Sequence, residues 1–429
     1  MSIKNIEIPP GMQTAAFAMG DGALDEIASF KATVFPGRKP WIVADTNTWE
    51  AAGKKAAGLL PDAYEPMIFP GTPKLHPESS ISDELAKKIS AMPDCLPIAV
   101  GSGVINDIVK RAAGIAGVTY CCVPTASSVD GYTASGAAMS RDGFKMTLPC
   151  PAPYGLLVDT LVLQTAPAEM FASGYADLFA KVPAGGDWII ADALGVEKID
   201  ASIWELVQTP LRQRISDPGA FEPVFAGLAA TGYAMQLYHD SRPASGAEHL
   251  LSHVWEMEKL SFNGEEVSHG FKVSIGTMTT TMLMEFIMNT DAAAAAAIAA
   301  PPLSVEARCE EIDRLLIKNC YGSGVRELAL EKAELFGKYS SKTFEIWDSL
   351  RDKLAKQLIS STDAAALLRK ADAPVHFSEI GLTEEQFIHG IRTAQLIRKR
   401  YTILDMLYYA GLLTPAIGYV IENFKKFAK

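Results

Sequence analysis

No stretch of the 429-residue sequence reaches the roughly 18 apolar residues that a membrane span requires. The nearest approach, Asp291 to Ala300, reads DAAAAAAIAA and is closed by Pro301, so it predicts a helix end. The first residues, MSIKNIEIPPGMQ, contain no apolar run of the kind that secretory leaders carry. We therefore expect a cytoplasmic protein with no membrane partner.

Paired cysteines and an excess of positive charge are also lacking. The six cysteines show no CxxC spacing, and Cys121 and Cys122 lie in an apolar run typical of a buried strand. We expect reduced, structural thiols. The net charge of −11 argues against a nucleic-acid partner, because phosphate backbones are held by clustered Lys and Arg. An anionic substrate would need a local basic pocket instead.

The composition is that of a soluble globular protein, with 48% apolar and 21% charged residues, and the length favours two domains. Short apolar runs alternate with helical stretches over the first 160 residues, which predicts a βαβ arrangement. The strands are expected at Pro40 to Thr46, Leu96 to Gly103, Val118 to Thr125 and Leu156 to Thr160. Helical spacing dominates after Pro167. We predict an α/β domain of nucleotide-binding type over 1–165 and an all-α domain over 166–429.

A glycine turn follows the second of these strands, where LPIAV runs into Gly101, Ser102 and Gly103 before a helix start. Such glycines let the backbone approach a diphosphate, and the helix N-terminus attracts its charge. The turn therefore suits a dinucleotide, although GSG is also common in ordinary tight turns.

Polar residues follow two other strands. Asp45, at the end of the first strand, could accept hydrogen bonds from an adenosine ribose and would then favour NAD, or it could be an ordinary turn aspartate. The loop VPTASSVDGYTASGAA offers Thr125, Ser128 and Asp130 at an edge where α/β sheets bind ligands. A solvated Ser/Thr-rich turn is the alternative.

Three of the seven histidines fall within 21 residues. His249 and His253 are four apart and share a face if helical, and His269 follows. With a carboxylate such as Asp177 they could hold a divalent metal and leave a position open for substrate. Scattered structural histidines, and an ordinary first-turn aspartate, are the alternatives.

Several of these motifs lie within five longer segments, and the order of these segments along the chain is itself informative. They are GSGVINDIVK, VPTASSVDGYTASGAA, ASGYADLFAKVPAGGDW, SRPASGAEHLLSHVWE and HGFKVSIGT. Together they resemble the sn-glycerol-1-phosphate dehydrogenase family, most closely its bacterial branch linked to arabinose operons. That family belongs to the superfamily of iron-containing alcohol dehydrogenases and dehydroquinate synthases. The resemblance spans residues 35 to 280.

The resemblance implies a dehydroquinate synthase-like fold, in which residues 1–165 form a Rossmann-like dinucleotide-binding domain and residues 166–429 form a helical metal- and substrate-binding domain. It also implies an active site in a cleft between the domains, and a homodimer. The implied metal ligands are Asp177, His249 and His269, with zinc, nickel or iron bound. His253 then lies beside the substrate and relays a proton. The implied cofactor positions are Asp45, Gly101, Ser102, Gly103, Asp107, Thr125 and Ser128. Asp130 meets the substrate hydroxyls.

The expected reaction is the reduction of dihydroxyacetone phosphate to sn-glycerol-1-phosphate with NAD(P)H, and its reverse. Lys145 and Lys181 are candidates for the substrate phosphate, or are ordinary surface lysines. The alternatives are a glycerol-type polyol dehydrogenase, a dehydroquinate-synthase-like lyase, and a metal-free protein that binds only a nucleotide or a partner. The 19 residues between His249 and His269 weaken the lyase alternative.

Overall fold

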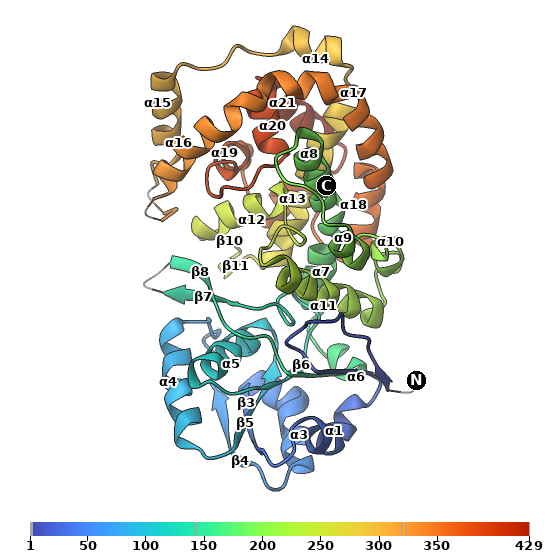
Figure 1. Ribbon diagram of the computed structural model, residues 1–429, viewed down its shortest axis with the longest axis vertical. Coiled ribbons are helices and arrows are strands. Elements are labelled where there is room, and N and C mark those ends of the chain that lie inside the picture. The colour runs from blue at the N-terminus through green and yellow to red at the C-terminus, as the bar shows by residue number, and fades with distance from the viewer. Residues whose placement is uncertain (1–2, 142–143, 319, 323, 429) are drawn as a thin grey trace. The chain divides into compact units, whose positions relative to one another are not determined.

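The computed structural model describes residues 3–141, 144–318, 320–322 and 324–428 (Figure 1). Its contacts divide into two compact units, Met1–Gly174 with Gln213–Asp240 and Tyr175–Arg212 with Ser241–Lys429. Within the described residues, the first unit contains a parallel sheet with helices, and the regular structure of the second is helical apart from one short hairpin. The predicted fold class is therefore confirmed. Across the described residues, no helix combines the length and apolarity needed to cross a bilayer.

The first unit is built on a seven-stranded sheet of order β1-β2-β9-β6-β5-β3-β4. Only β1 and β2 pair antiparallel, and the other neighbours are parallel. The strands are β1 (Lys4–Asn5), β2 (Ala16–Gly20), β3 (Lys39–Asp45), β4 (Tyr64–Phe69), β5 (Cys95–Gly101), β6 (Cys121–Pro124) and β9 (Gly155–Asp159). Four of them, β3, β5, β6 and β9, are the strands expected from apolar runs. Their burial on both faces is typical of parallel sheets.

Helices pack on the sheet because its alternating side chains are apolar on both faces. Ile42, Leu96 and Val123 form one core with Ile27 and Ala56 from the helices. The first helices are η1 (Ala23–Glu26), α1 (Ile27–Val34), α2 (Thr46–Thr48), η2 (Trp49–Gly53) and α3 (Lys54–Leu59). They are followed by α4 (Ser79–Ala91), α5 (Gly103–Ala116), α6 (Thr160–Leu163) and the hairpin β7 (Ala137–Arg141) and β8 (Phe144–Leu148).

Helix α11 (Phe221–Tyr238) belongs to the first unit by its contacts, although it follows the predicted boundary at residue 165. Its Phe225 ring lies 6.2 Å from the Phe17 ring and 5.4 Å from the Tyr132 ring, measured between centroids. Thr133 Oγ1 donates to the Ala229 carbonyl at 2.7 Å. A later segment of chain thus completes the first unit.

The second unit is organised around α13 (His269–Met288), of whose 20 residues 16 are buried. A helix buried on nearly all sides is a core element. The helices of this part of the chain are α7 (Ala168–Phe179), α8 (Lys181–Leu194), α9 (Ala201–Val207), α10 (Leu211–Arg214), α12 (Ala247–Met257), α14 (Ala292–Ile298), α15 (Val305–Leu315), α16 (Val325–Phe336), η3 (Gly337–Tyr339), α17 (Ser340–Gln357), α18 (Ser361–Lys370), η4 (Phe377–Ile380), α19 (Glu384–Ala394), α20 (Ile403–Tyr409) and α21 (Leu413–Phe424).

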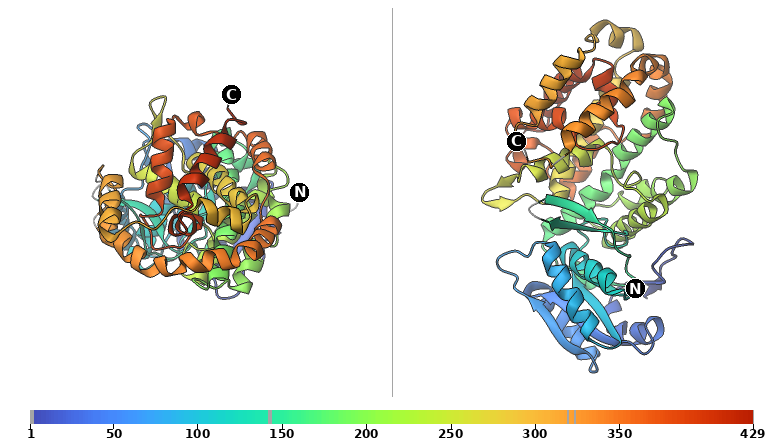
Figure 2. Two further views of the ribbon diagram at one scale, coloured as in Figure 1. Left: turned by 90° about the horizontal axis from the view of Figure 1, so that it is seen from above. Right: turned by 60° about the vertical axis from the view of Figure 1, so that its left-hand side comes forward.

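Figure 2 shows the orange helices α16 and α17 following one another around the outside of this unit. The exposed hairpin β10 (Ser261–Phe262) and β11 (Glu265–Glu266) projects from it. The apolar segment 402–421, which the sequence leaves open as interface or core, forms α20 and α21 and is largely buried.

Candidate metal centre and nucleotide turn

Three side chains that the resemblance assigns to a metal come together in the second unit. Asp177 lies on α7, His249 lies on α12, and His269 is the first residue of α13. One ligand atom of each lies within 4.8 Å of the other two. His249 Nε2 is 3.2 Å from Asp177 Oδ1, and the centroids of the His249 and His269 rings are 5.5 Å apart. Residues distant in sequence therefore form one compact donor set.

A glycine allows the two histidine-bearing helices to lie this close. A Cβ atom at Gly276 of α13 would be 2.2 Å from the carbonyl oxygen of Glu248 on α12. That backbone cannot be moved without moving His249, the next residue along α12. The close contact between α12 and α13 therefore sets the separation of two of the candidate ligands.

A lysine lies against the carboxylate of this donor set. Lys181 Nζ is 2.9 Å from Asp177 Oδ1, and both side chains are at most 1% exposed. Burial alone would raise the pKa of Asp177, but Lys181 and the hydrogen bond from His249 outweigh it and hold that pKa well below its usual range. Asp177 is therefore ionised and available as a ligand at neutral pH.

The two histidines of α12 differ in charge. Burial and Lys181 act to lower the pKa of His249, but hydrogen bonds to Asp177 and Glu248 raise it to about 9. Burial lowers the pKa of His253 to about 4, against the opposing effect of Glu256. His253 is therefore neutral at physiological pH, with its ring centroid 6.1 Å from that of His269.

Two glutamates of α12 accept hydrogen bonds from the histidines, and the sequence reasoning missed both. Glu248 Oε1 is 2.9 Å from His249 Nδ1. Glu256 Oε1 is 2.7 Å from His269 Nδ1, and its Oε2 is 3.2 Å from His253 Nδ1. The helical spacing from His253 to Glu256, three residues, could have revealed the second of them.

A further buried carboxylate lies behind Glu248. Asp187 accepts backbone hydrogen bonds from Ala247 and Ile403, each at 2.6 Å. Burial and then the nearby Glu248 raise the pKa of Asp187 to about 7, against the lowering effects of Arg242 and of the backbone hydrogen bonds. Asp187 thus ties the start of α12 to the start of α20.

The donor set fits a divalent metal. One carboxylate and two imidazoles are ligands that zinc, nickel and iron all accept. Ligand atoms about 2.1 Å from one ion lie at most about 4.2 Å apart. The three ligand atoms, which lie within 4.8 Å of one another, are therefore close to the separations that binding one ion requires.

The predicted nucleotide turn has the expected local form in the first unit. Gly101 ends β5, Ser102 is the N-cap, and Gly103 begins α5. A Cβ at Gly101 would lie 2.5 Å from Cβ of Ile105, so glycine is needed for the helix to start so close to the strand. The side chain of Ser102 makes no capping hydrogen bond. The turn therefore places the N-terminus of a 14-residue helix at the carboxyl edge of the sheet.

Asp45 takes part in the local turn that the sequence offered as the alternative to ribose binding. Its Oδ1 accepts hydrogen bonds from the backbone N–H groups of Asn47 and Thr48, each at 2.9 Å. Thr48 Oγ1 in turn accepts from the Asp45 backbone N–H at 3.0 Å, which completes a capping box. One carboxylate oxygen is therefore engaged in capping α2.

The Ser/Thr-rich loop is held close to the turn. Thr125 and Ser128 are buried, and the Thr125 N–H donates to the Gly101 carbonyl at 3.1 Å. Asp130 is half-buried. A Cβ at Gly174 would lie 1.6 Å from the carbonyl oxygen of Ser127, so the loop backbone rests directly on α7 at that glycine.

Asp107 and a lysine that the sequence reasoning missed support the next part of this loop. Asp107 Oδ2 accepts from the Ala138 N–H at 3.3 Å, at the start of β7. Lys110, fully buried on α5, donates to the carbonyls of Gly131, Ala134 and Gly136. Lys110 Nζ also lies 3.6 Å from Asp107 Oδ1, one helical turn earlier, but its three carbonyl partners are backbone atoms that no sequence pattern marks.

The two lysines predicted for the substrate phosphate differ in setting. Lys181 is buried against Asp177 and is not a surface lysine. Lys145 lies on β8, where its backbone pairs with Ser140, and its side chain lies outside the described residues.

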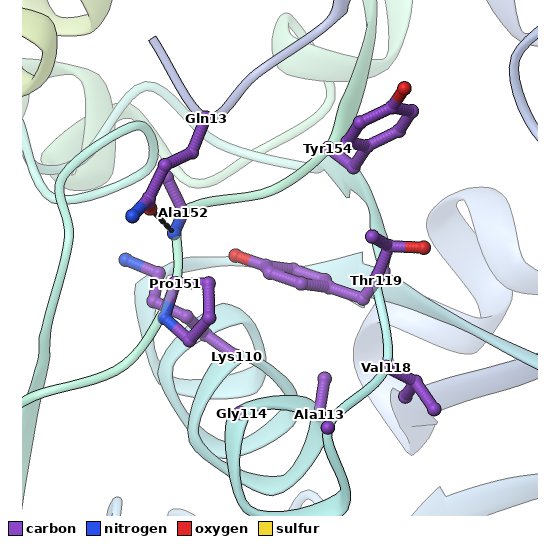
Figure 3. Close-up of a pocket in the computed structure, with 11 residues that line it drawn as sticks. Gln13, Lys110, Ala113, Gly114, Val118, Thr119, Pro151, Ala152 and Tyr154 are labelled. Atoms are coloured by element: carbon purple, nitrogen blue, oxygen red, sulfur yellow. Dashed lines mark hydrogen bonds between the residues drawn. The ribbon is translucent and has the colours of Figure 1, made fainter.

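A cavity of about 420 Å³ lies at the opposite end of α5 from the nucleotide turn (Figure 3). Ala113, Gly114, Tyr120, Pro151 and Tyr154 are among the residues that line it, and the loop beside it is fixed by the Ala152 N–H donating to Gln13 Oε1 at 2.7 Å. The cofactor residues predicted from the sequence do not line this cavity.

Comparison with known proteins identifies the family. A glycerol-1-phosphate dehydrogenase (NAD(P)+) of Bacillus licheniformis is 31% identical over 94% of this chain and 90% of its own. The chain belongs to the glycerol-1-phosphate dehydrogenase family. A Bacillus subtilis protein of the same name is 27% identical over 85% of this chain and 84% of its own. The family resemblance read from the motifs is confirmed.

Comparisons with the wider superfamily agree with the fold of this member of the glycerol-1-phosphate dehydrogenase family. The profile of the iron-containing alcohol dehydrogenases matches residues 18–167. A glycerol dehydrogenase structure from Schizosaccharomyces pombe superposes with a TM-score of 0.60 at 15% identity, covering 99% of this chain and 93% of that one. An iron-containing alcohol dehydrogenase from Thermococcus thioreducens gives 0.56 at 15% identity, covering 96% and 99%. At these identities the structures establish the fold alone.

Proposed function

We propose that this protein is a metal-dependent oxidoreductase that reduces dihydroxyacetone phosphate to sn-glycerol-1-phosphate with NADH or NADPH, and catalyses the reverse reaction. The observation that carries the proposal is the convergence of Asp177, His249 and His269 within 4.8 Å, in a chain of the glycerol-1-phosphate dehydrogenase family. The relatives' printed name supplies the substrate and the nucleotide.

In this proposal Asp177, His249 and His269 hold one divalent ion. When bound, such an ion polarises a carbonyl oxygen and stabilises the negative charge that develops on reduction. Asp177 contributes a carboxylate that is already ionised. His253, neutral and beside the ligands, would accept the hydroxyl proton of sn-glycerol-1-phosphate in the oxidation; in the reduction it would first take up a proton from water and then pass it to the product oxygen.

The nucleotide would bind the N-terminal Rossmann-like domain that we propose for residues 1–165, and the metal would bind the helical domain of residues 166–429, apart from α11, whose contacts place it in the first unit. The diphosphate would lie on the backbone of Gly101, Ser102 and Gly103, at the start of α5. Asp107, Thr125 and Ser128 would line the same site. Asp45 would bind the adenosine ribose through the carboxylate oxygen that does not cap α2, which favours NAD over NADP.

Asp130 would meet the substrate hydroxyls, and Lys145 and Lys181 would balance the substrate phosphate. Lys181 has an anionic partner in Asp177, so its charge is already partly balanced. We further propose a cytoplasmic homodimer that uses zinc, with nickel or iron as the other candidates.

The test is an activity screen on purified protein stripped of metal and then loaded with zinc, nickel or iron in turn. We expect NADH consumption with dihydroxyacetone phosphate to return with at least one metal, and the product to be the sn-1 enantiomer. Turnover of glycerol with no activity on the phosphate would indicate a polyol dehydrogenase instead. Release of phosphate from a lyase substrate without net change in NADH absorbance would indicate the dehydroquinate-synthase-like reaction. Nucleotide binding without metal uptake or turnover would leave only a binding protein.

A further inference from the structure

Glu256 lies between two histidines and touches both through different oxygens. Its Oε1 is 2.7 Å from Nδ1 of His269, and its Oε2 is 3.2 Å from Nδ1 of His253. The glutamate side chain is only 4% exposed, whereas the two rings are 25% and 30% exposed. A nearly buried carboxylate therefore joins a proposed metal ligand to the proposed proton relay.

The chemistry of these groups fixes which ring nitrogen carries the proton. An ionised carboxylate only accepts hydrogen bonds, so each Nδ1 facing it must be a donor. Lys272 Nζ, 3.9 Å from Glu256 Oε1 and 1% exposed, supplies a compensating positive charge. Ser252 Oγ also lies near His269 Nδ1, but at 3.5 Å it is a much weaker acceptor than the carboxylate. Both rings therefore carry hydrogen on Nδ1, and in the neutral form of each ring the lone pair is on Nε2.

The same relation recurs at the other histidine of the donor set. Glu248 Oε1 accepts from His249 Nδ1 at 2.9 Å and from the Gly246 N–H at 2.6 Å, while His249 Nε2 faces Asp177. Histidines that bind metals are generally oriented by a carboxylate or carbonyl on the second ring nitrogen. Glu256 differs from Glu248 because it serves two rings at once.

We propose that Glu256 is a positioning residue that holds His269 and His253 together in the Nδ1–H form. His269 thereby presents Nε2 to the metal, and His253 presents Nε2 as a proton acceptor. The inference deepens the proposed function and rests on its metal centre. One glutamate thus supports both metal binding by His269 and proton transfer by His253.

The first test uses the unaltered full-length protein, free of metal and nucleotide. Two-bond ¹H–¹⁵N spectra of ¹⁵N-histidine protein report which nitrogen is protonated, with resonances assigned from His253→Gln and His269→Gln. We expect the Nδ1–H form for both rings. An Nε2–H form at either ring overturns the proposal, and this result needs no Glu256 variant to fold.

The second test removes the shared acceptor. A glutamine at position 256 has one accepting oxygen and one donating NH₂, so it can satisfy only one of the two Nδ1–H groups. We expect Glu256→Gln to weaken zinc binding by about 10- to 100-fold in a chelator competition, and to change the tautomer of at least one ring. The matched control is Glu265→Gln, which makes the same change in charge on the exposed β11 strand.

Unchanged zinc affinity in Glu256→Gln, or an equal loss in Glu265→Gln, overturns the proposal. Neither measurement uses substrate or nucleotide. A protein that oxidised a different polyol would give the same tautomers and zinc affinities, so failure of this inference is distinguishable from failure of the proposed function.

Discussion

The contact between α12 and α13 gives the sharpest test of how the metal centre is built. In Gly276→Ala, the new Cβ would lie 2.2 Å from the Glu248 carbonyl oxygen, where a carbon-to-oxygen contact normally needs about 3.3 Å. The helices must therefore separate by about 1 Å at this point. Because the obstructing atom is backbone, no side-chain rotation can relieve the contact.

The expected loss follows from that displacement. His249 follows Glu248 on α12, so a shift of about 1 Å exceeds the roughly 0.5 Å within which a supporting structure must hold such a site. We expect zinc affinity to fall by at least about tenfold, and overpacking to lower the free energy of unfolding by about 1–3 kcal/mol. Chelator competition and urea unfolding measure the two quantities.

Gly418→Ala is the matched control. Gly418 lies in the interior of α21, is exposed, and has no neighbouring atom within 4 Å of an added Cβ. Alanine there should raise helix stability by up to about 1 kcal/mol and leave zinc affinity unchanged. If Gly276→Ala bound zinc like the control and were equally stable, the argument that this contact sets the ligand spacing would be refuted.

Three further perturbations test other parts of the molecule. Gly174→Ala, which drives a Cβ to within 1.6 Å of the Ser127 oxygen, should weaken NADH binding at least about tenfold by fluorescence titration while zinc binding persists; unaltered NADH affinity would contradict it. Lys181→Met removes the ammonium group beside buried Asp177 and leaves His249 to balance that carboxylate, so the metal-free protein should lose up to about 3–5 kcal/mol of stability and regain much of it with zinc. An unchanged KM for dihydroxyacetone phosphate would remove Lys181 from the phosphate site. The pKa of Asp187 is raised from 3.8 to about 7, so between these values the folded protein holds a proton that the unfolded chain has lost. The free energy of unfolding should therefore fall as pH rises, by about 1.4 kcal/mol per pH unit, until the decrease levels off near pH 7. Urea unfolding at pH 5, 6 and 7 should show that Asp187→Asn lacks this pH-dependent loss of stability. Equal pH dependence of the unfolding free energy in wild type and variant would refute the prediction.

Periodic and strongly apolar elements could be predicted from the sequence. Strands β3, β5, β6 and β9 were found because buried parallel strands are continuous apolar runs. Strand β4 was missed because it is only half-buried and contains Pro66. The place of α11 in the first unit could not be seen, because helical spacing does not reveal which core a helix joins.

The three candidate metal ligands were predicted from motifs that occur in a fixed order along the chain. The residues that hold the ligands and the loops in place could not be predicted in this way. Asp177, His249 and His269 have side chains typical of metal ligands. Lys110 acts on backbone carbonyls, and Glu256 acts on a histidine 13 residues away. Contacts of that kind depend on the tertiary path of the chain and leave no local pattern.

One consequence follows from the membership of the two units. The three candidate ligands and both supporting glutamates belong to a single unit, and the glycine turn belongs to the other. Substitutions in the glycine turn should therefore give inactive protein that still binds its metal ion fully. Metal content alone would then not distinguish active from inactive preparations, and the affinity for the dinucleotide has to be measured as well.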